Sequence, residues 1–191
     1  MKRLRAPLAE ADVVDLRLGD EVYLDGTVHL LRDATHHRIF EEHVAPPVSL
    51  AGSVVLHAAP SFRQIGERYE ILSVGATTSM RVDRYTPELV ERYGVRAVVG
   101  KGGMGPATAA AMHRAKAVYL ALVGGASALV TSQVEAVEGR WWPDLLGEAL
   151  WQVRVKELGP AIVAIDTSGQ NRFDEVQREA RRRLDEIAAG P

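Results

Sequence analysis

Short apolar runs separated by glycine and proline recur along the 191-residue chain, and they predict strands that alternate with helices. A hairpin is predicted over residues 20–32, because Asp25-Gly26 separates two β-rich runs. Further strands are predicted at 53–60, 68–75, 95–100, 117–125, 148–158 and 160–169. Helices are predicted at 33–44, at 86–93, from Pro106 onward, at 126–134 and at 171–189. We expect Asp33 to cap the first of these helices and Pro46-Pro47 to stop it.

This order of elements indicates an α/β fold with a mixed sheet and flanking helices. The chain has no internal repeat and no low-complexity linker. We therefore predict an N-terminal arm over residues 1–14 and a single domain over residues 15–191.

The last predicted helix is amphipathic. Its apolar residues recur at helical spacing and form one stripe, made of Phe173, Val176, Ala180, Leu184 and Ile187. The opposite face mixes arginines with acidic residues. We expect these charges to pair along the helix and to be solvated, not to bind nucleic acid.

Composition narrows the classes of function. The chain is 47% hydrophobic and 25% charged, with a net charge of -2, so we expect neither nucleic acid nor an anionic membrane as a partner. It has no secretory signal and no apolar run near the ~20 residues that span a bilayer, which predicts a soluble, cytoplasmic protein. The absence of cysteine excludes a disulfide framework, a thiolate zinc site and an iron–sulfur cluster held by this chain's own thiolates.

The stretch GKGGMG, residues 100–105, lies between a predicted strand and a predicted helix, as a dinucleotide-binding fingerprint does. Two features disfavour a nucleotide site. No acidic residue follows the next strand until Glu135, and Lys101 occupies a loop where the backbone should approach the phosphates. The other interpretation is a glycine-rich turn, in which the lysine is incidental or serves another ligand.

A second polar cluster precedes this loop. In GATTSMR, Thr77 and Thr78 are followed by Arg81, whose planar guanidinium suits a carboxylate, while Lys101 adds a compact positive charge. Two cations and two hydroxyls at the ends of strands would suit a small dicarboxylate. Turn chemistry explains the threonines equally well, and Arg81 could instead pair with Asp83 or Glu88.

GATTSMRVDRYTPELVERYG followed by VVGKGGMG resembles the C-terminal region of class I fumarases and the separate β subunits of two-chain fumarases and L-tartrate dehydratases. The segments GDEVYLDGTVHLLRDATHHRI, HAAP, AVYLALVGGASALV and EALWQVRVKELGPAIVAIDTSG extend the resemblance over roughly residues 15–175. It implies the swivelling β/β/α fold of that family.

The resemblance also implies an activity. These enzymes are hydro-lyases that reversibly remove water from a 2-hydroxy dicarboxylate. Their [4Fe-4S] cluster is carried by the other part of the enzyme, which in two-chain forms is a cysteine-bearing α subunit. This chain would be the β subunit, inactive alone, in an α2β2-type assembly. Malate and fumarate are the favoured substrate pair, with L-tartrate second and mesaconate also open.

Residue roles follow from the same resemblance. Thr77 matches the threonine that takes part in proton transfer at the reacting carbon, although Thr78 and Ser79 compete for this role. Arg81 and Lys101 match the cations that hold the substrate carboxylates, and Thr78 and Gly102 lie beside them as further substrate-binding residues. Arg32 matches another carboxylate-binding arginine; the alternative for it is a structural pair with Asp33 or Glu41.

The remaining polar and aromatic residues favour structural roles. His36 and His43 share one face of their predicted helix, but a third metal ligand is missing, so solvated surface is the better interpretation. His57 is expected to form hydrogen bonds in the core or behind the site. Trp141, Trp142 and Trp151 are expected in the core or in a subunit contact. A nucleotide-binding domain and a non-catalytic interaction domain of the same fold stay open as alternatives.

Overall fold

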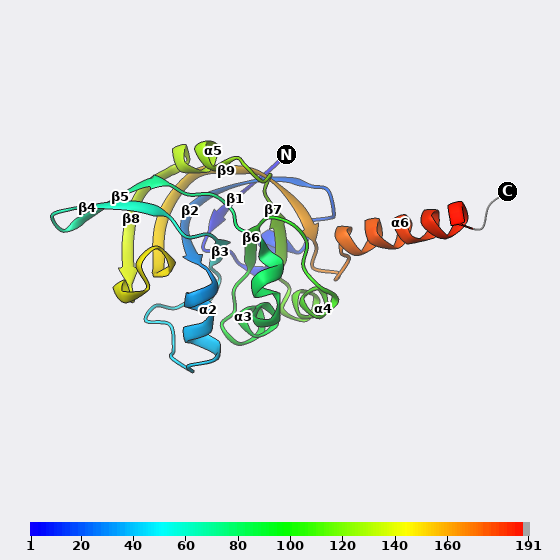
Figure 1. The fold of residues 1–191 in the computed structure, drawn as a ribbon, viewed down its shortest axis with the longest axis horizontal. Helices are drawn as coiled ribbons and strands as arrows, with labels where there is room; N and C mark the ends of the chain where they lie inside the picture. Colours follow the sequence, from blue (N-terminus) through cyan, green and yellow to red (C-terminus); the bar gives the residue numbers. More distant parts are fainter. Residues whose placement is uncertain (189–191) are drawn as a thin grey trace.

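The computed structural model describes residues 1–188 and contains one seven-stranded sheet, a small two-stranded sheet and helices around them (Figure 1). The strands of the main sheet, in spatial order, are β1 (Lys2–Ala6), β2 (Glu21–Leu31), β3 (Val54–His57), β6 (Ala97–Gly100), β7 (Val118–Ala121), β9 (Leu150–Ile165) and β8 (Val134–Trp141). β4 (Ser61–Ile65) and β5 (Arg68–Ser73) form the small sheet. The predicted α/β class with a mixed sheet and flanking helices is confirmed.

The main sheet closes on itself. β2 pairs in parallel with β3 along one edge and antiparallel with β9 along the other. β3, β6 and β7 continue in parallel, and β7 pairs antiparallel with β9. The five strands β2, β3, β6, β7 and β9 therefore form a ring in which each has a partner on both sides, as in a small barrel.

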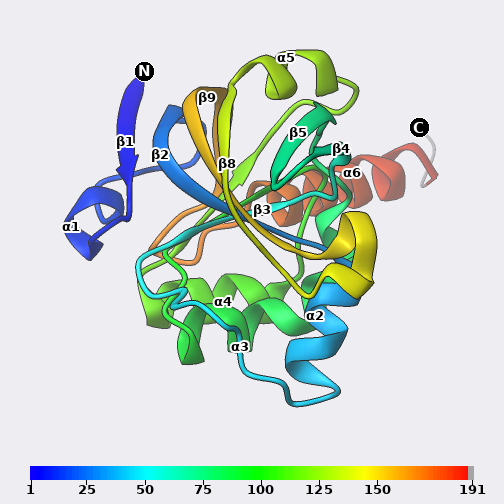
Figure 2. The same cartoon turned by 90° about the vertical axis from the view of Figure 1, so that its left-hand side faces the viewer.

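Alternating residues of the central strands fill two separate cores. Leu56 of β3 and Val99 of β6 point into the ring, whereas Val55 and Val98 point outward. The outward side chains pack against α2 (Asp33–Phe40), α3 (Thr86–Arg92) and α4 (Pro106–Ala115), which lie together on one side of the ring (Figure 2). Trp151 is fully buried in the inner core, as expected for a core aromatic.

The other helices are α1 (Glu10–Val13), α5 (Ser127–Ser132) and α6 (Arg172–Ala188), with 3-10 turns at Ser79–Tyr85 and Pro143–Glu148. α2 ends at Phe40, four residues before the predicted end. Asp33 is its first residue and not its cap; Arg32 occupies the N-cap position, without a capping side-chain hydrogen bond. Asp33 still places negative charge in the first turn, where the helix dipole favours it.

The predicted hairpin over residues 20–32 is wrong. β2 runs straight through Asp25-Gly26 as one strand, and its register against β9 shifts at this point, which marks a β-bulge. Gly26 has φ +99°, and a Cβ there would lie 2.5 Å from the carbonyl oxygen of Ala6. The glycine therefore permits close contact with β1, because no side chain could fit between the two strands.

One more prediction is corrected by the strand pairing. The strands predicted at 148–158 and 160–169 are one continuous strand, β9, which passes through Gly159-Pro160. β4 and β8 were not predicted. Residues 1–14, expected as an arm, contain β1 and α1, and β1 pairs in parallel with the first half of β2.

No helix within residues 1–188 combines the length and the apolar character needed to cross a bilayer.

Candidate active site at the carboxyl edge of the parallel strands

Four parallel strands end at the same edge of the ring. β2, β3, β6 and β7 run in one direction, so the residues that follow them lie side by side. Arg32 follows β2, His57 ends β3 and Lys101 follows β6. Ligands of α/β sheets bind beyond such carboxyl ends, where loops converge on a rigid framework.

The backbone joins the two sequence motifs directly. Thr78 and Lys101 form a parallel β-bridge. The Lys101 amide donates to the Thr77 carbonyl at 3.1 Å, and the Ser79 amide donates to the Lys101 carbonyl at 3.0 Å. The segments TTS and GKG, about twenty residues apart in sequence, are therefore fixed against each other in a defined register.

Thr77 is anchored to the end of β3. Its amide and its hydroxyl both donate to the carbonyl oxygen of His57, at 2.7 and 2.8 Å. The hydroxyl proton is thereby held inward, and the oxygen keeps lone pairs available to a ligand. Thr77 is partly exposed, whereas Thr78 is exposed and Ser79 is buried.

A buried polar network supports these residues from beneath. His57 Nδ1 lies 3.0 Å from Ser79 Oγ, and the Tyr119 hydroxyl lies 2.9 Å from the same oxygen and donates to the Gly102 carbonyl at 2.9 Å. Burial, with a smaller contribution from neighbouring His36, lowers the pKa of His57 well below its ordinary value. Burial also raises the pKa of Tyr119. Both groups are therefore neutral at pH 7, and the predicted hydrogen-bonding role of His57 is confirmed.

Glycine is required at two positions of the loop for different reasons. A Cβ on Gly100 would lie 1.9 Å from Ser79 Oγ, so only glycine leaves room for the network. Gly102 has open space around it but adopts φ +73°, the left-handed region that favours glycine. These glycines serve the packing and the turn from which Lys101 projects.

Lys101 itself is half-buried and lies beside the loop after β7, where a Cβ on Gly124 would be 3.5 Å from its Cδ atom. Within residues 1–188, no carboxylate forms an ion pair with its ammonium group. An unpaired, partly desolvated cation at the edge of a sheet is suited to hold an anionic ligand.

The two arginines share an acidic partner. Arg81 pairs with Asp33 at 2.7 Å, and Arg32 Nε lies 3.5 Å from Asp33 and 3.8 Å from Glu148. Of the structural alternatives, the pair of Arg32 with Asp33 is therefore present. The pairs of Arg81 with Asp83 or Glu88 and of Arg32 with Glu41 do not form among the described residues.

Asp83 binds the N-terminus of α4 and not Arg81. Its carboxylate accepts hydrogen bonds from the Gly105 amide at 2.9 Å and from the Thr108 hydroxyl at 2.7 Å, at the N-terminus of α4. A dinucleotide loop presents this helix end to phosphate groups. Here a carboxylate already occupies it and would repel them, so the geometry disfavours the nucleotide interpretation of GKGGMG.

The prediction for His36 is wrong. It is fully buried, and its ring lies 5.4 Å from that of His57. Burial lowers the pKa of His36 to about 4, so the ring is neutral. His43 lies beyond the end of α2, and no group of three or more metal-binding side chains is present within residues 1–188.

Asp33 and Glu148 were not predicted in the site. Glu148 approaches from far along the chain and accepts a hydrogen bond from the Ala34 amide at 2.7 Å. No local pattern marks such a residue, because only the closure of the ring brings it to the start of α2. Asp33 carried a signal, since it adjoins Arg32, but a helix-capping role explained it equally well.

The sequence matches the family described as the fumarase C-terminus over residues 2–176. The chain belongs to this family. The match covers the carboxyl edge just described, including both motifs and Arg32, and it confirms the resemblance to the C-terminal region of class I fumarases.

Three relatives illustrate the range of the family. The L(+)-tartrate dehydratase subunit beta of Escherichia coli strain K12 is 42% identical over 97% of this chain and 93% of its own length. A Methanocaldococcus jannaschii protein, provisionally named L(+)-tartrate dehydratase subunit beta, is 34% identical over 94% of this chain and 95% of its own length. A Geobacillus stearothermophilus protein, provisionally named fumarate hydratase class I, is 34% identical over 96% of this chain but only 36% of its own length.

Proposed function

We propose that this fumarase C-terminus family chain is the β subunit of a two-chain hydro-lyase that reversibly removes water from a 2-hydroxy dicarboxylate. The observation that carries the proposal is the bridge between TTS and GKG, which brings Thr77 and the unpaired Lys101 to one edge. The names of the relatives, two of them beta subunits of a dehydratase, support it.

The cations of this edge would hold the substrate carboxylates. Lys101 is free to bind one of them directly. Arg81 is 57% exposed and pairs with Asp33, but exposed ion pairs contribute only about 0–1 kcal/mol, so a substrate carboxylate can replace Asp33 at little cost. Arg32 is more buried, and its Nε atom lies 3.5 Å from the same carboxylate of Asp33.

Thr77 would act at the reacting carbon. Because its hydroxyl proton points to the His57 carbonyl, its oxygen can face the C–H bond that loses a proton. A threonine hydroxyl is a weak base at neutral pH, so it must give up its own proton to a stronger base as it takes the proton from carbon, and we assign that base to the partner subunit. Nearby positive charge stabilises the negative charge that develops as the proton leaves.

The iron–sulfur cluster implied by the family does not fit this chain. The sequence has no cysteine, and residues 1–188 contain no cluster of alternative ligands. We therefore assign the [4Fe-4S] cluster to a cysteine-bearing α subunit in an α2β2-type assembly.

We propose L-tartrate as the first substrate to test and malate as the second. The family resemblance in the sequence favoured malate and fumarate. The change of order follows from the relatives, because the E. coli tartrate dehydratase subunit matches at 42% over nearly its whole length. The fumarate hydratase class I relative matches at 34% over 36% of its length.

The test is co-expression with the product of a neighbouring cysteine-bearing gene, anaerobic cluster reconstitution, and dehydration assays on L-tartrate, malate and citramalate. We expect turnover of L-tartrate by the complex and none by this chain alone. A reconstituted complex that dehydrates none of the three would contradict the enzymatic proposal and favour a non-catalytic interaction domain.

A further inference from the structure

The last helix has no partner along most of its length. α6 is 17 residues long and extends away from the ring (Figure 1). None of its residues is buried, and its apolar stripe is open to solvent, with Leu184 64% and Ile187 77% exposed. Most of the stability of a helix in a protein comes from packing of its apolar face, so an exposed apolar stripe of this kind calls for a packing partner.

The spacing of the stripe is symmetric. Phe173, Val176, Ala180, Leu184 and Ile187 are separated by three, four, four and three residues, so the pattern reads the same in both directions about Ala180. We propose that α6 pairs antiparallel with α6 of a second copy of this chain, around a two-fold axis at Ala180. The interface is then self-complementary, as a two-fold axis requires.

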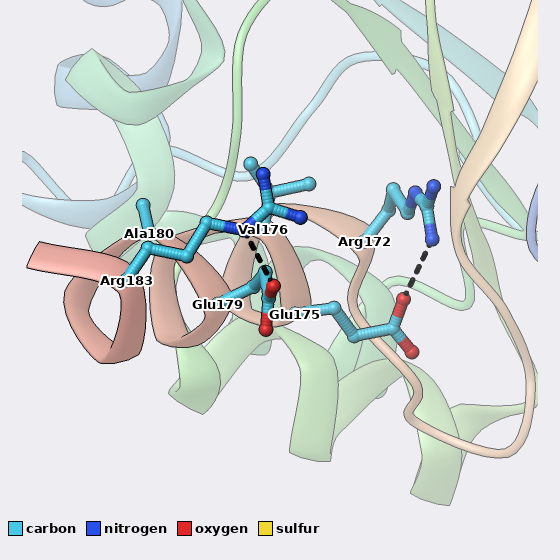
Figure 3. Close-up of a pocket in the computed structure, with 6 residues that line it drawn as sticks. All are labelled: Arg172, Glu175, Val176, Glu179, Ala180 and Arg183. Atoms are coloured by element: carbon cyan, nitrogen blue, oxygen red, sulfur yellow. Dashed lines mark hydrogen bonds and ion pairs between the residues drawn. The ribbon is translucent and has the colours of Figure 1, made fainter. Parts of the chain in front are cut away.

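In such a pair, apolar side chains of one helix lie opposite apolar side chains of the other. Phe173 lies opposite Ile187 of the second copy, and Val176 lies opposite Leu184. The two Ala180 side chains meet at the axis, where their small size lets the helix backbones approach closely. Figure 3 shows a pocket along α6 beside Val176 and Ala180, which the charged side chains of the Arg172–Glu175 and Arg183–Glu179 ion pairs also line.

The charges beside the stripe fit the same arrangement. With about 100° and 1.5 Å per residue, the two-fold axis brings Arg183 next to Glu179 of the second copy and Arg172 next to Glu186. Each of these contacts occurs twice, giving four pairs of opposite charge. Arg181 approaches its own copy on one flank and Glu179 approaches its own copy on the other, giving two pairs of like charge. The balance favours a second copy over an unrelated surface.

The N-terminal end of α6 leaves space for the C-terminal end of the second helix. A groove runs between the start of α6 and the loop of the candidate site; apolar side chains such as Phe173, Val176 and Met80 line it, together with the polar residues Asp83, Asp174 and Gln177. In the antiparallel pair, Leu184 and Ile187 of the second copy lie over the apolar side chains of this groove. The two bodies then lie at opposite ends of the helix pair.

Cysteine cross-linking of the full chain tests this pairing, because the natural sequence contains no cysteine to interfere. We expect Ala180→Cys to form a disulfide-linked dimer under mild oxidation. Arg178→Cys is the matched control, since Arg178 is exposed on the opposite face of α6. Equal cross-linking of the two variants, or none for Ala180→Cys, would overturn the proposal.

The register and direction are tested by mixing. We expect Val176→Cys and Leu184→Cys chains to cross-link with each other much more than either does with itself. A parallel pair would give the reverse, with Val176→Cys cross-linking to itself, and would overturn the antiparallel arrangement. The Ala180→Cys test is then repeated with the α subunit bound. If the dimer is lost and the introduced thiol is protected from alkylation, the pairing is overturned and the stripe is assigned to the α subunit instead.

Discussion

Replacing Lys101 with alanine is expected to lower kcat/KM of the reconstituted complex by about 100-fold or more. Lys101 is the cation of the candidate site that forms no ion pair among the described residues, so no neighbouring group takes over its charge when it is removed. The chain should remain folded, because the backbone of Lys101 and not its side chain makes the bridge to Thr78. Steady-state dehydration kinetics and the thermal midpoint of the isolated chain measure the two effects separately.

Lys156→Ala is the matched control for this variant. Lys156 is exposed on β9, away from the carboxyl edge of the parallel strands, and its loss removes the same charge from the chain. We expect its kcat/KM to stay within about twofold of the natural protein. Full activity in Lys101→Ala, or an equal loss in both variants, would show that Lys101 has no direct role.

Replacing Gly100 with alanine is expected to destabilise the chain by about 2–3 kcal/mol and to disrupt the site at the same time. The added Cβ would lie 1.9 Å from Ser79 Oγ and 3.3 Å from the Tyr119 hydroxyl. Both neighbours are buried and hydrogen-bonded, so neither can move away without breaking the network beneath Thr77 and Lys101. Chemical denaturation of the isolated chain measures the loss.

A double variant tests the cause of this loss. Ser79→Ala removes the oxygen that the new Cβ would meet, although it also costs the contacts to His57 and Tyr119. We expect Gly100→Ala with Ser79→Ala to be more stable than the sum of the single effects predicts, by about 1 kcal/mol. Additive losses would mean that the steric conflict with Ser79 is not the reason for glycine at position 100.

The sequence predicted those features of the fold that local patterns encode. The strands around Val54–His57 and Ala97–Gly100 and the helix that begins at Pro106 are formed as predicted, because apolar runs and a proline at the start of a helix carry strong local signals. Asp25-Gly26 misled the prediction, since the same dipeptide serves a hairpin turn and a β-bulge. Only the contact of Gly26 with Ala6 decides between them.

Some features of the candidate site could likewise be predicted from local sequence, and others could not. TTSMR and GKG were predicted to act together, and the bridge between Thr78 and Lys101 brings them into contact. The roles of their side chains stay predictions. The acidic partners of the arginines could not be predicted, because Glu148 reaches the start of α2 from more than a hundred residues away. The burial of His36 likewise depends on packing against His57 and Tyr85, which a helical pattern does not reveal.

The role of Thr77 in proton transfer is tested most directly by comparing two adjacent hydroxyls in the reconstituted complex. Thr77→Val and Thr78→Val each replace a hydroxyl by a methyl group of similar size, and they differ in whether the hydroxyl is anchored at the end of β3. We expect Thr77→Val to lower kcat for dehydration by about 100-fold or more and Thr78→Val to retain most of it. Normal turnover in Thr77→Val, or a loss confined to Thr78→Val, would contradict this role.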